Sequence, residues 1–205
     1  MNTITHIAGG GLALIGSIFC ILAACRYSGW SSIVGAAVYC ASMVCVYTMS
    51  SVYHGLRPGV GKKVMQVLDH CAIYFLIAGT YTPILITGFL PLYPAIGWGL
   101  LIMEWSLTAL AVSLTAIDLK KFSIFSMVCD IFLGCGIVFF LPQAMEVMSP
   151  AGFYWLLAGG IAYTIGAVLF GLGKKLAWMH GTFHLFVILG GFLQYMAIIL
   201  HLYKK

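Results

Sequence analysis

Apolar residues run along most of the chain in unbroken stretches of about 20, each long enough for a helix to cross the ~30 Å hydrocarbon core of a bilayer. A membrane β-barrel would instead show alternating polarity over strands of about 10 residues. Glycines, prolines and charged clusters separate seven such stretches, near residues 7–25, 31–53, 69–90, 94–117, 122–141, 152–172 and 180–203. The pattern predicts an all-α integral membrane protein, a single domain over residues 1–205 with seven transmembrane helices.

The amino-acid composition also indicates an integral membrane protein. Hydrophobic residues make up 62% of the chain and charged residues 7%, whereas about 25% of a soluble domain is charged. The net charge of +5 comes mostly from lysine pairs in loops, which suits anionic lipid headgroups and predicts no nucleic-acid partner. The seven cysteines have no Cys-x-x-Cys spacing, so we expect reduced, packing side chains.

The basic residues also predict the orientation. Seven of the ten Lys and Arg residues fall in three loops that a seven-helix topology places on one side, and the positive-inside rule makes that side cytoplasmic. Arg26, Lys204 and Lys205 fall on the other side. The amino terminus is therefore predicted inside and the carboxyl terminus outside. Residues 1–5 carry no Lys or Arg, unlike a secretory signal, so we expect the first apolar run to be retained.

Four polar residues stand out because this topology brings them to the cytoplasmic end of the bundle: His54, Asp69, His180 and His184. His180 and His184 are four residues apart, so they share one helix face and could share a metal ion. His54, at the end of the second span, would supply a third nitrogen. Three ligands with an open position are typical of catalytic rather than structural zinc.

Ser50 lies one helical turn deeper than His54 on the same face, where its hydroxyl could hold a zinc-bound water, a substrate carbonyl or a ligand imidazole. Asp69 could then act as the general base of a zinc hydrolase. A rival interpretation remains open: the histidines extend toward lipid headgroups, and Asp69 pairs with Lys62 or Lys63.

Other polar residues are weaker candidates. His6, at the start of the first span, could approach the site from the cytoplasmic side, whereas His70 points to a different face from Asp69 and His201 falls at the outer end. Glu104 and Asp130 lie well inside the fourth and fifth spans, where an ionisable group costs about 2.5–3.5 kcal/mol on insertion scales. Their partners cannot be deduced from the sequence.

Several stretches resemble one known family. They are Ser50-Ser51-Val52-Tyr53-His54, Leu68-Asp69-His70-Cys71-Ala72-Ile73-Tyr74, Ala78-Gly79-Thr80-Tyr81-Thr82-Pro83, His180-x-x-x-His184 and the glycine-rich stretch 159–166. In order and placement they resemble the hemolysin III family, which belongs with the progestin and adiponectin receptors, over nearly the whole chain. Two features depart from the pattern: the acidic residue upstream of Asn2, Thr5 and His6 is absent, and Asp130 fits no family block.

The resemblance implies a seven-helix fold with an intracellular amino terminus and a Zn²⁺ ion held by His54, His180 and His184. Asp69 and Ser50 would lie beside the metal-bound water. The wider superfamily includes alkaline ceramidases, and bacterial members are named for haemolysis and linked to lipid homeostasis. We therefore expect a zinc-dependent hydrolase of a lipid amide or ester in a bacterial plasma membrane, with membrane lipids or a fatty acid as partners.

Two alternatives to the enzyme stay open. In the first, the protein is a cytolysin or channel whose zinc only ties the spans together; a channel would call for a polar path, for which Glu104 and Asp130 are the main mid-span residues. In the second, the protein is a sensor that binds a lipid and returns it unchanged. An open coordination position on the metal would favour the enzyme.

Overall fold

The computed structural model describes residues 2–27, 29–172 and 177–203, and the side chains of 5–27, 29–171 and 181–203. This part of the chain is helical and contains no strand. The elements are α1 (Asn2–Tyr27), α2 (Trp30–Gly55), α3 (Val60–Pro83), the π-helical η1 (Ile84–Phe89), α4 (Leu90–Leu92), α5 (Pro94–Ile117), α6 (Ser123–Cys135), the 3₁₀-helical η2 (Gly136–Phe140), α7 (Leu141–Leu172), α8 (Ala177–Ala197) and the π-helical η3 (Ile198–Leu202).

Six of the described helical runs are long and apolar enough to cross a membrane. Runs at Trp30–Gly55 and Pro94–Ile117 match predicted spans closely. The helix that contains the span predicted near 69–90 begins earlier, at Val60, because the polar segment with Lys62 and Lys63 is itself helical. Apolar length thus indicates where a helix crosses the membrane, but not where its polar ends stop.

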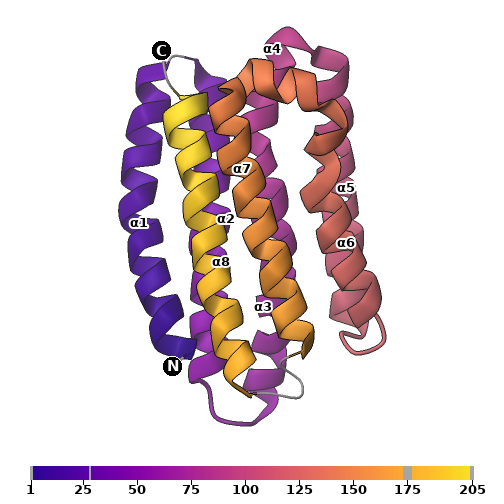
Figure 1. Cartoon of the computed structure of the whole chain (residues 1–205). Helices are drawn as coiled ribbons and strands as arrows, with labels where there is room; N and C mark the ends of the chain where they lie inside the picture. The colour runs from indigo at the N-terminus through magenta and orange to yellow at the C-terminus, as the bar shows by residue number, and fades with distance from the viewer. Residues whose placement is uncertain (1, 28, 173–176, 204–205) are drawn as a thin grey trace.

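The longest run, Ser123–Gly171, has 49 residues, or about 73 Å of helix at 1.5 Å per residue. It is interrupted at Ser149, whose φ of 65° and ψ of 157° leave the helical region just before Pro150. In Figure 1 the first part of α7 lies across one end of the bundle, and the rest turns to run beside α8. The bend falls between the predicted segments 122–141 and 152–172.

Small residues allow the helices to approach closely. A Cβ on Gly79 of α3 would lie 2.1 Å from the Ser42 hydroxyl of α2, and one on Gly159 of α7 would lie 3.0 Å from the Gly190 carbonyl of α8. Such contacts take the place of hydrophobic burial between helices in lipid. The α1–α2, α2–α3 and α7–α8 pairs are the most extensive contacts between helices.

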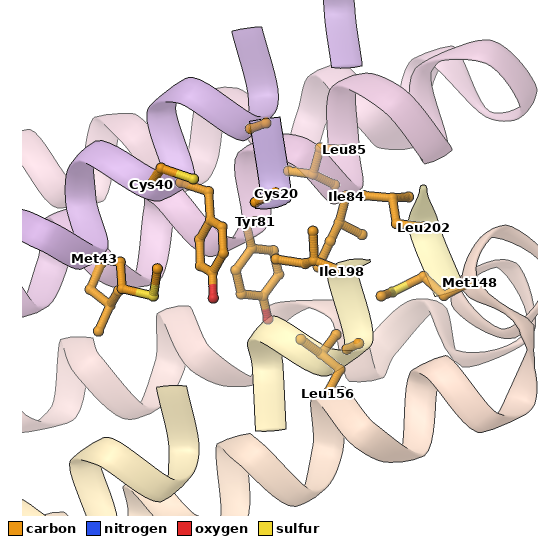
Figure 2. Packing of buried hydrophobic residues seen from close by; sticks show 14 of the residues in the cluster. Cys20, Cys40, Met43, Tyr81, Ile84, Leu85, Met148, Leu156, Ile198 and Leu202 are labelled. Atoms are coloured by element: carbon orange, nitrogen blue, oxygen red, sulfur yellow. The ribbon is translucent and has the colours of Figure 1, made fainter. Parts of the chain in front are cut away.

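The main apolar core lies among these helices. Figure 2 shows Tyr81 and Ile84 packed near Ile198 of η3, with Cys20 and Cys40 close by as unbridged side chains. All seven cysteines are free, as predicted. A smaller cluster of Tyr74, Ala111, Cys129 and Leu133 joins α3 to α5 and α6. Helix α3 therefore contacts α2 on one side and the α5–α6 pair on the other.

Candidate metal centre

Three histidine rings from three helices meet at one end of the bundle. His6 lies near the start of α1, His54 in the last turn of α2, and His184 in the first half of α8. Ring centroids are 4.2 Å apart for His6 and His184, 4.7 Å for His54 and His184, and 6.3 Å for His6 and His54. Figure 1 shows why they meet: α1 begins, α2 ends and α8 begins at the same end.

The orientation of the rings is specific. His6 and His184 are each 2% exposed and share a hydrogen bond between Nε2 of His6 and Nδ1 of His184. The His184 ring meets both other rings almost at right angles, 87° to His6 and 85° to His54. With Nδ1 facing His6, Nε2 of His184 lies on the opposite side of the ring and is the candidate metal-binding nitrogen.

Sequence reasoning gave His6 too little weight. His6 was treated as a weaker candidate, although its place at the start of the first span already allowed it to approach the site. In the structure the start of α1 lies at the same end of the bundle as the end of α2 and the start of α8, which brings His6 to the other histidines.

Ser50 and Asp69 also come together, on α2 and α3. The Ser50 side chain is 4% exposed and lies close enough to the Asp69 carboxylate to act as its hydrogen-bonding neighbour. Ser50 lies one turn from His54, about 6 Å along the helix, and Asp69 lies roughly 13 Å inside α3 from Val60. Ser50 therefore lies on the same face of α2 as His54, with the Asp69 carboxylate next to it.

The rival partner of Asp69 is engaged elsewhere. Lys62 donates from Nζ to the Leu56 carbonyl at 2.9 Å, and its ammonium lies 5.2 Å from the centre of the Tyr53 ring. The Tyr53 ring neighbours both His54, at 4.8 Å between centroids, and the Asp69 charge. Asp69 lies next to Ser50, and of its two rival partners Lys62 is engaged with other groups.

The remaining histidines are placed as follows. His180 lies in the first turn of α8, but its side chain is outside the described residues. His70 donates from Nδ1 to the Gln66 carbonyl of its own helix at 2.8 Å and packs against Phe170. His201 shares a 3.1 Å hydrogen bond with Ser149 at the opposite end of the bundle.

The side-chain chemistry fits a zinc ion, although the described residues contain no group of three or more His, Cys, Asp or Glu side chains arranged to hold a metal. Two nitrogens bound to one tetrahedral zinc lie about 3.3 Å apart, given Zn–N bonds of about 2.0–2.1 Å. The hydrogen-bonded nitrogens, Nε2 of His6 and Nδ1 of His184, are closer than this and cannot both be ligands. His54 and the outer nitrogen of His184 remain suitable donors, with a carboxylate and a hydroxyl nearby.

These features define a polytopic helical membrane protein with a polar, histidine-containing site at one end of its bundle. The profile of the family described as "Haemolysin-III related" matches residues 1–195, and the chain belongs to that family, as the motifs predicted.

Among characterised proteins, the chain is 34% identical to "Hemolysin-3" of Bacillus cereus, over 98% of this chain and 90% of that protein. It is 30% identical to the "Hemolysin-3 homolog" of Bacillus subtilis (strain 168), over 99% and 93% respectively. A more distant similarity, 27% identity, links 81% of this chain to 42% of the "Adiponectin receptor protein" of Drosophila melanogaster. No solved structure gives a significant match.

Proposed function

We propose that this chain is a zinc-dependent membrane hydrolase that cleaves an amide or ester bond of a lipid at the cytoplasmic end of the bundle. The observation that carries the proposal is the convergence of His54 and His184 beside the hydrogen-bonded pair Ser50 and Asp69. Nitrogen ligands next to a carboxylate and a hydroxyl are what metal-assisted hydrolysis requires.

His54, His180 and His184 would hold the ion, and Zn²⁺ bound there supplies a Lewis acid that polarises a carbonyl. His6 acts on His184 without being a ligand. Its hydrogen bond to Nδ1 fixes which nitrogen of His184 faces the metal and how the ring is oriented. This role explains why His6 is as deeply buried as His184 itself.

Asp69 and Ser50 divide the remaining work. The Asp69 carboxylate accepts a proton from the attacking water and returns it to the leaving amine or alcohol. The Ser50 hydroxyl holds the carboxylate in place through its hydrogen bond. Because Ser50 is almost fully buried, few competing waters reach this side of the carboxylate.

The topology that we propose has seven spans, with α6 and the part of α7 after Ser149 as the fifth and sixth. The 49-residue run is more than twice the length that one span needs, and its break at Ser149 supports a return across the membrane. The α2–α3 loop, which carries Arg57, and the α5–α6 loop, which carries Lys120, share the histidine end in Figure 1. By the positive-inside rule this end is cytoplasmic, in a bacterial plasma membrane.

A second candidate function is a non-enzymatic cytolysin or channel in which the ion only joins helices. The observation that favours it is the name "Hemolysin-3" of the Bacillus cereus relative. A purely structural zinc would normally have four protein ligands. Retention of zinc without any turnover, together with leakage of dye from vesicles, would support this candidate over the hydrolase.

The deciding experiment combines metal content with turnover. Protein purified without chelator is measured by plasma mass spectrometry as wild type, His184→Ala and His201→Ala, and is then incubated with a panel of lipid amides and esters. We expect about one zinc per chain in wild type and in His201→Ala, little in His184→Ala, and fatty-acid release only where zinc is retained. Wild-type protein without zinc, even after zinc is added back, would contradict both the site and the hydrolase.

A further inference from the structure

Helices α3, α5 and α6 enclose a second set of buried polar side chains, away from the histidines. The buried face of α5 repeats every three or four residues, and three of its positions are polar: Glu104, Thr108 and Thr115. Their side chains are 0%, 1% and 2% exposed. Ionisable groups inside a span are costly and commonly mark a pathway or a binding site.

Glu104 is the most unusual of these residues. Neither of its carboxyl oxygens has a hydrogen-bond partner in the part of the chain that the structure describes, and neither does the hydroxyl of Thr108, one turn along the same face. Glu104 Oε1 lies 3.3 Å from the position that a Cβ on Gly136 would take. The absence of a side chain at Gly136 therefore leaves the room that the carboxyl group occupies.

The titratable neighbours of Glu104 carry no positive charge. Tyr81 of α3 is near it, and no Lys, Arg or His side chain in the described ranges pairs with it. An ionised carboxylate buried without a partner costs far more than its neutral acid. The site therefore favours a carboxyl group that carries a proton and has unused hydrogen-bonding capacity, the condition in which a buried water is expected.

A line of polar groups connects this position with the α5–α6 loop. Near the loop, the Tyr74 hydroxyl of α3 donates to Ser126 of α6 and shares a 3.2 Å hydrogen bond with Thr115 of α5. Asp130 lies one turn beyond Ser126, close enough to Tyr74 to act on it electrostatically, and its buried Oδ1 has no partner in the described structure.

Deeper along the same line, Tyr81 donates to the Gly134 carbonyl at 3.0 Å and accepts from the Ile137 amide at 3.2 Å. Tyr74 and Tyr81 are seven residues apart on α3, or about 10 Å. Beyond Glu104 the lining becomes apolar: a groove of about 390 Å³ is bordered by Leu100, Met103 and Phe140. The polar line thus begins near the loop and stops at Glu104.

We propose that Glu104 is a proton-binding site that exchanges its proton with water at the α5–α6 loop through Asp130 and the hydroxyls of Tyr74 and Thr108. The proton moves from one oxygen to the next through these groups and internal water, without any change of oxidation state. A metal cation fits less well, because Glu104 and Thr115 lie eleven residues apart on α5, about 16 Å along the helix, so that the oxygens are not gathered around one point. The site is separate from the histidines, since α1 and α8 contribute no residue to it.

Infrared spectroscopy of the whole protein in lipid vesicles tests the proposal. At neutral pH the wild type should show the C=O band of a protonated carboxylic acid, and this band should shift when H₂O is replaced by D₂O. The band assigned to Glu104 should be lost in Glu104→Gln. It should remain in Glu146→Gln, the matched change at an exposed carboxyl. In Asp130→Asn the deuterium shift should be slower.

A second measurement uses only the wild type, so it does not depend on whether these variants fold. Dicyclohexylcarbodiimide is an apolar reagent that reacts with protonated carboxyl groups. It should modify Glu104 in the membrane at neutral pH, and peptide mass mapping would detect the adduct. Absence of both the adduct and the Glu104 band would overturn the proposal. The path through these groups would be overturned if the Glu104 band exchanged its proton for deuterium as fast in Asp130→Asn and Tyr74→Phe as in wild type.

Discussion

His6 and His184 share a hydrogen bond although they are 178 positions apart in the sequence. The bond joins the start of α1 to α8 and places a second imidazole directly behind the candidate metal ligand His184. The site is therefore closed by the first and last helices together.

The first prediction concerns this bond. His6→Ala removes the group that orients His184, so we expect zinc affinity to fall by about 10- to 100-fold, the usual effect of losing a residue that supports a ligand. Competition with a chromogenic chelator measures the affinity. His201→Ala, at the opposite end, is the control and should bind as wild type does. Unchanged affinity in His6→Ala would mean that the contact only packs α1 against α8.

The second prediction concerns metal removal. A ligand that binds the folded state stabilises it by about 2.7 kcal/mol when its free concentration is 100 times Kd. Chelation should therefore lower the Tm of the wild type in detergent, and added zinc should restore it. His184→Ala should already have the lower Tm and respond to neither treatment. A chelator effect equal in the two proteins would place the metal elsewhere.

The third prediction separates catalysis from metal binding. Asp69→Asn keeps the size of the side chain but removes its capacity to accept a proton, so we expect hydrolysis to fall by about 10²- to 10⁴-fold. Zinc content should stay near the wild-type value, because Asp69 is not one of the proposed ligands. Ser50→Ala should lower the rate less, since it removes only the hydrogen bond to Asp69. Full activity in Asp69→Asn would remove this residue from the mechanism.

The fourth prediction uses neighbouring glycines of α7. In Gly159→Ala the new methyl group would lie 2.6 Å from Cγ of Gln194 and 3.0 Å from the Gly190 carbonyl, so we expect a loss of about 1–3 kcal/mol in stability. In Gly160→Ala the methyl group meets nothing within 4 Å, and stability should be unchanged or slightly higher. Thermal unfolding in detergent compares the two. Equal Tm values would contradict the close α7–α8 contact.

The fifth prediction concerns orientation. In a cysteine-free background, Lys120→Cys should react with a membrane-impermeant maleimide only after cells are lysed, because its loop shares the histidine end. Arg26→Cys, near the other end of α1, should react in intact cells. The opposite result would reverse the proposed topology and place the histidines outside the cell.

The helices could be predicted from the sequence because a membrane imposes one simple requirement, a long apolar run. The sequence could not predict that α3 begins at Val60, since an interfacial helical turn tolerates lysines that a span does not. The gap between the predicted segments 122–141 and 152–172 anticipated a break in this run, but not its place at Ser149, which leaves the helix through its backbone angles.

The site was predictable only in part. Spacing within one helix pairs Ser50 with His54 and His180 with His184, and topology adds Asp69. The contact of His6 with His184 depends on how α1 leans against α8, which no local pattern contains. The surroundings of Glu104 likewise depend on the glycine that faces it from another helix.

Helix α3 lies between two groups of polar side chains in the bundle. One face presents Asp69 to Ser50 on α2, and another presents Tyr74 to Ser126 on α6. A rotation or slide of α3 that displaced Asp69 would also displace Tyr74, since the two residues lie five positions apart on the same helix. A movement of α3 that rearranged one of these two groups of side chains would therefore also disturb the other.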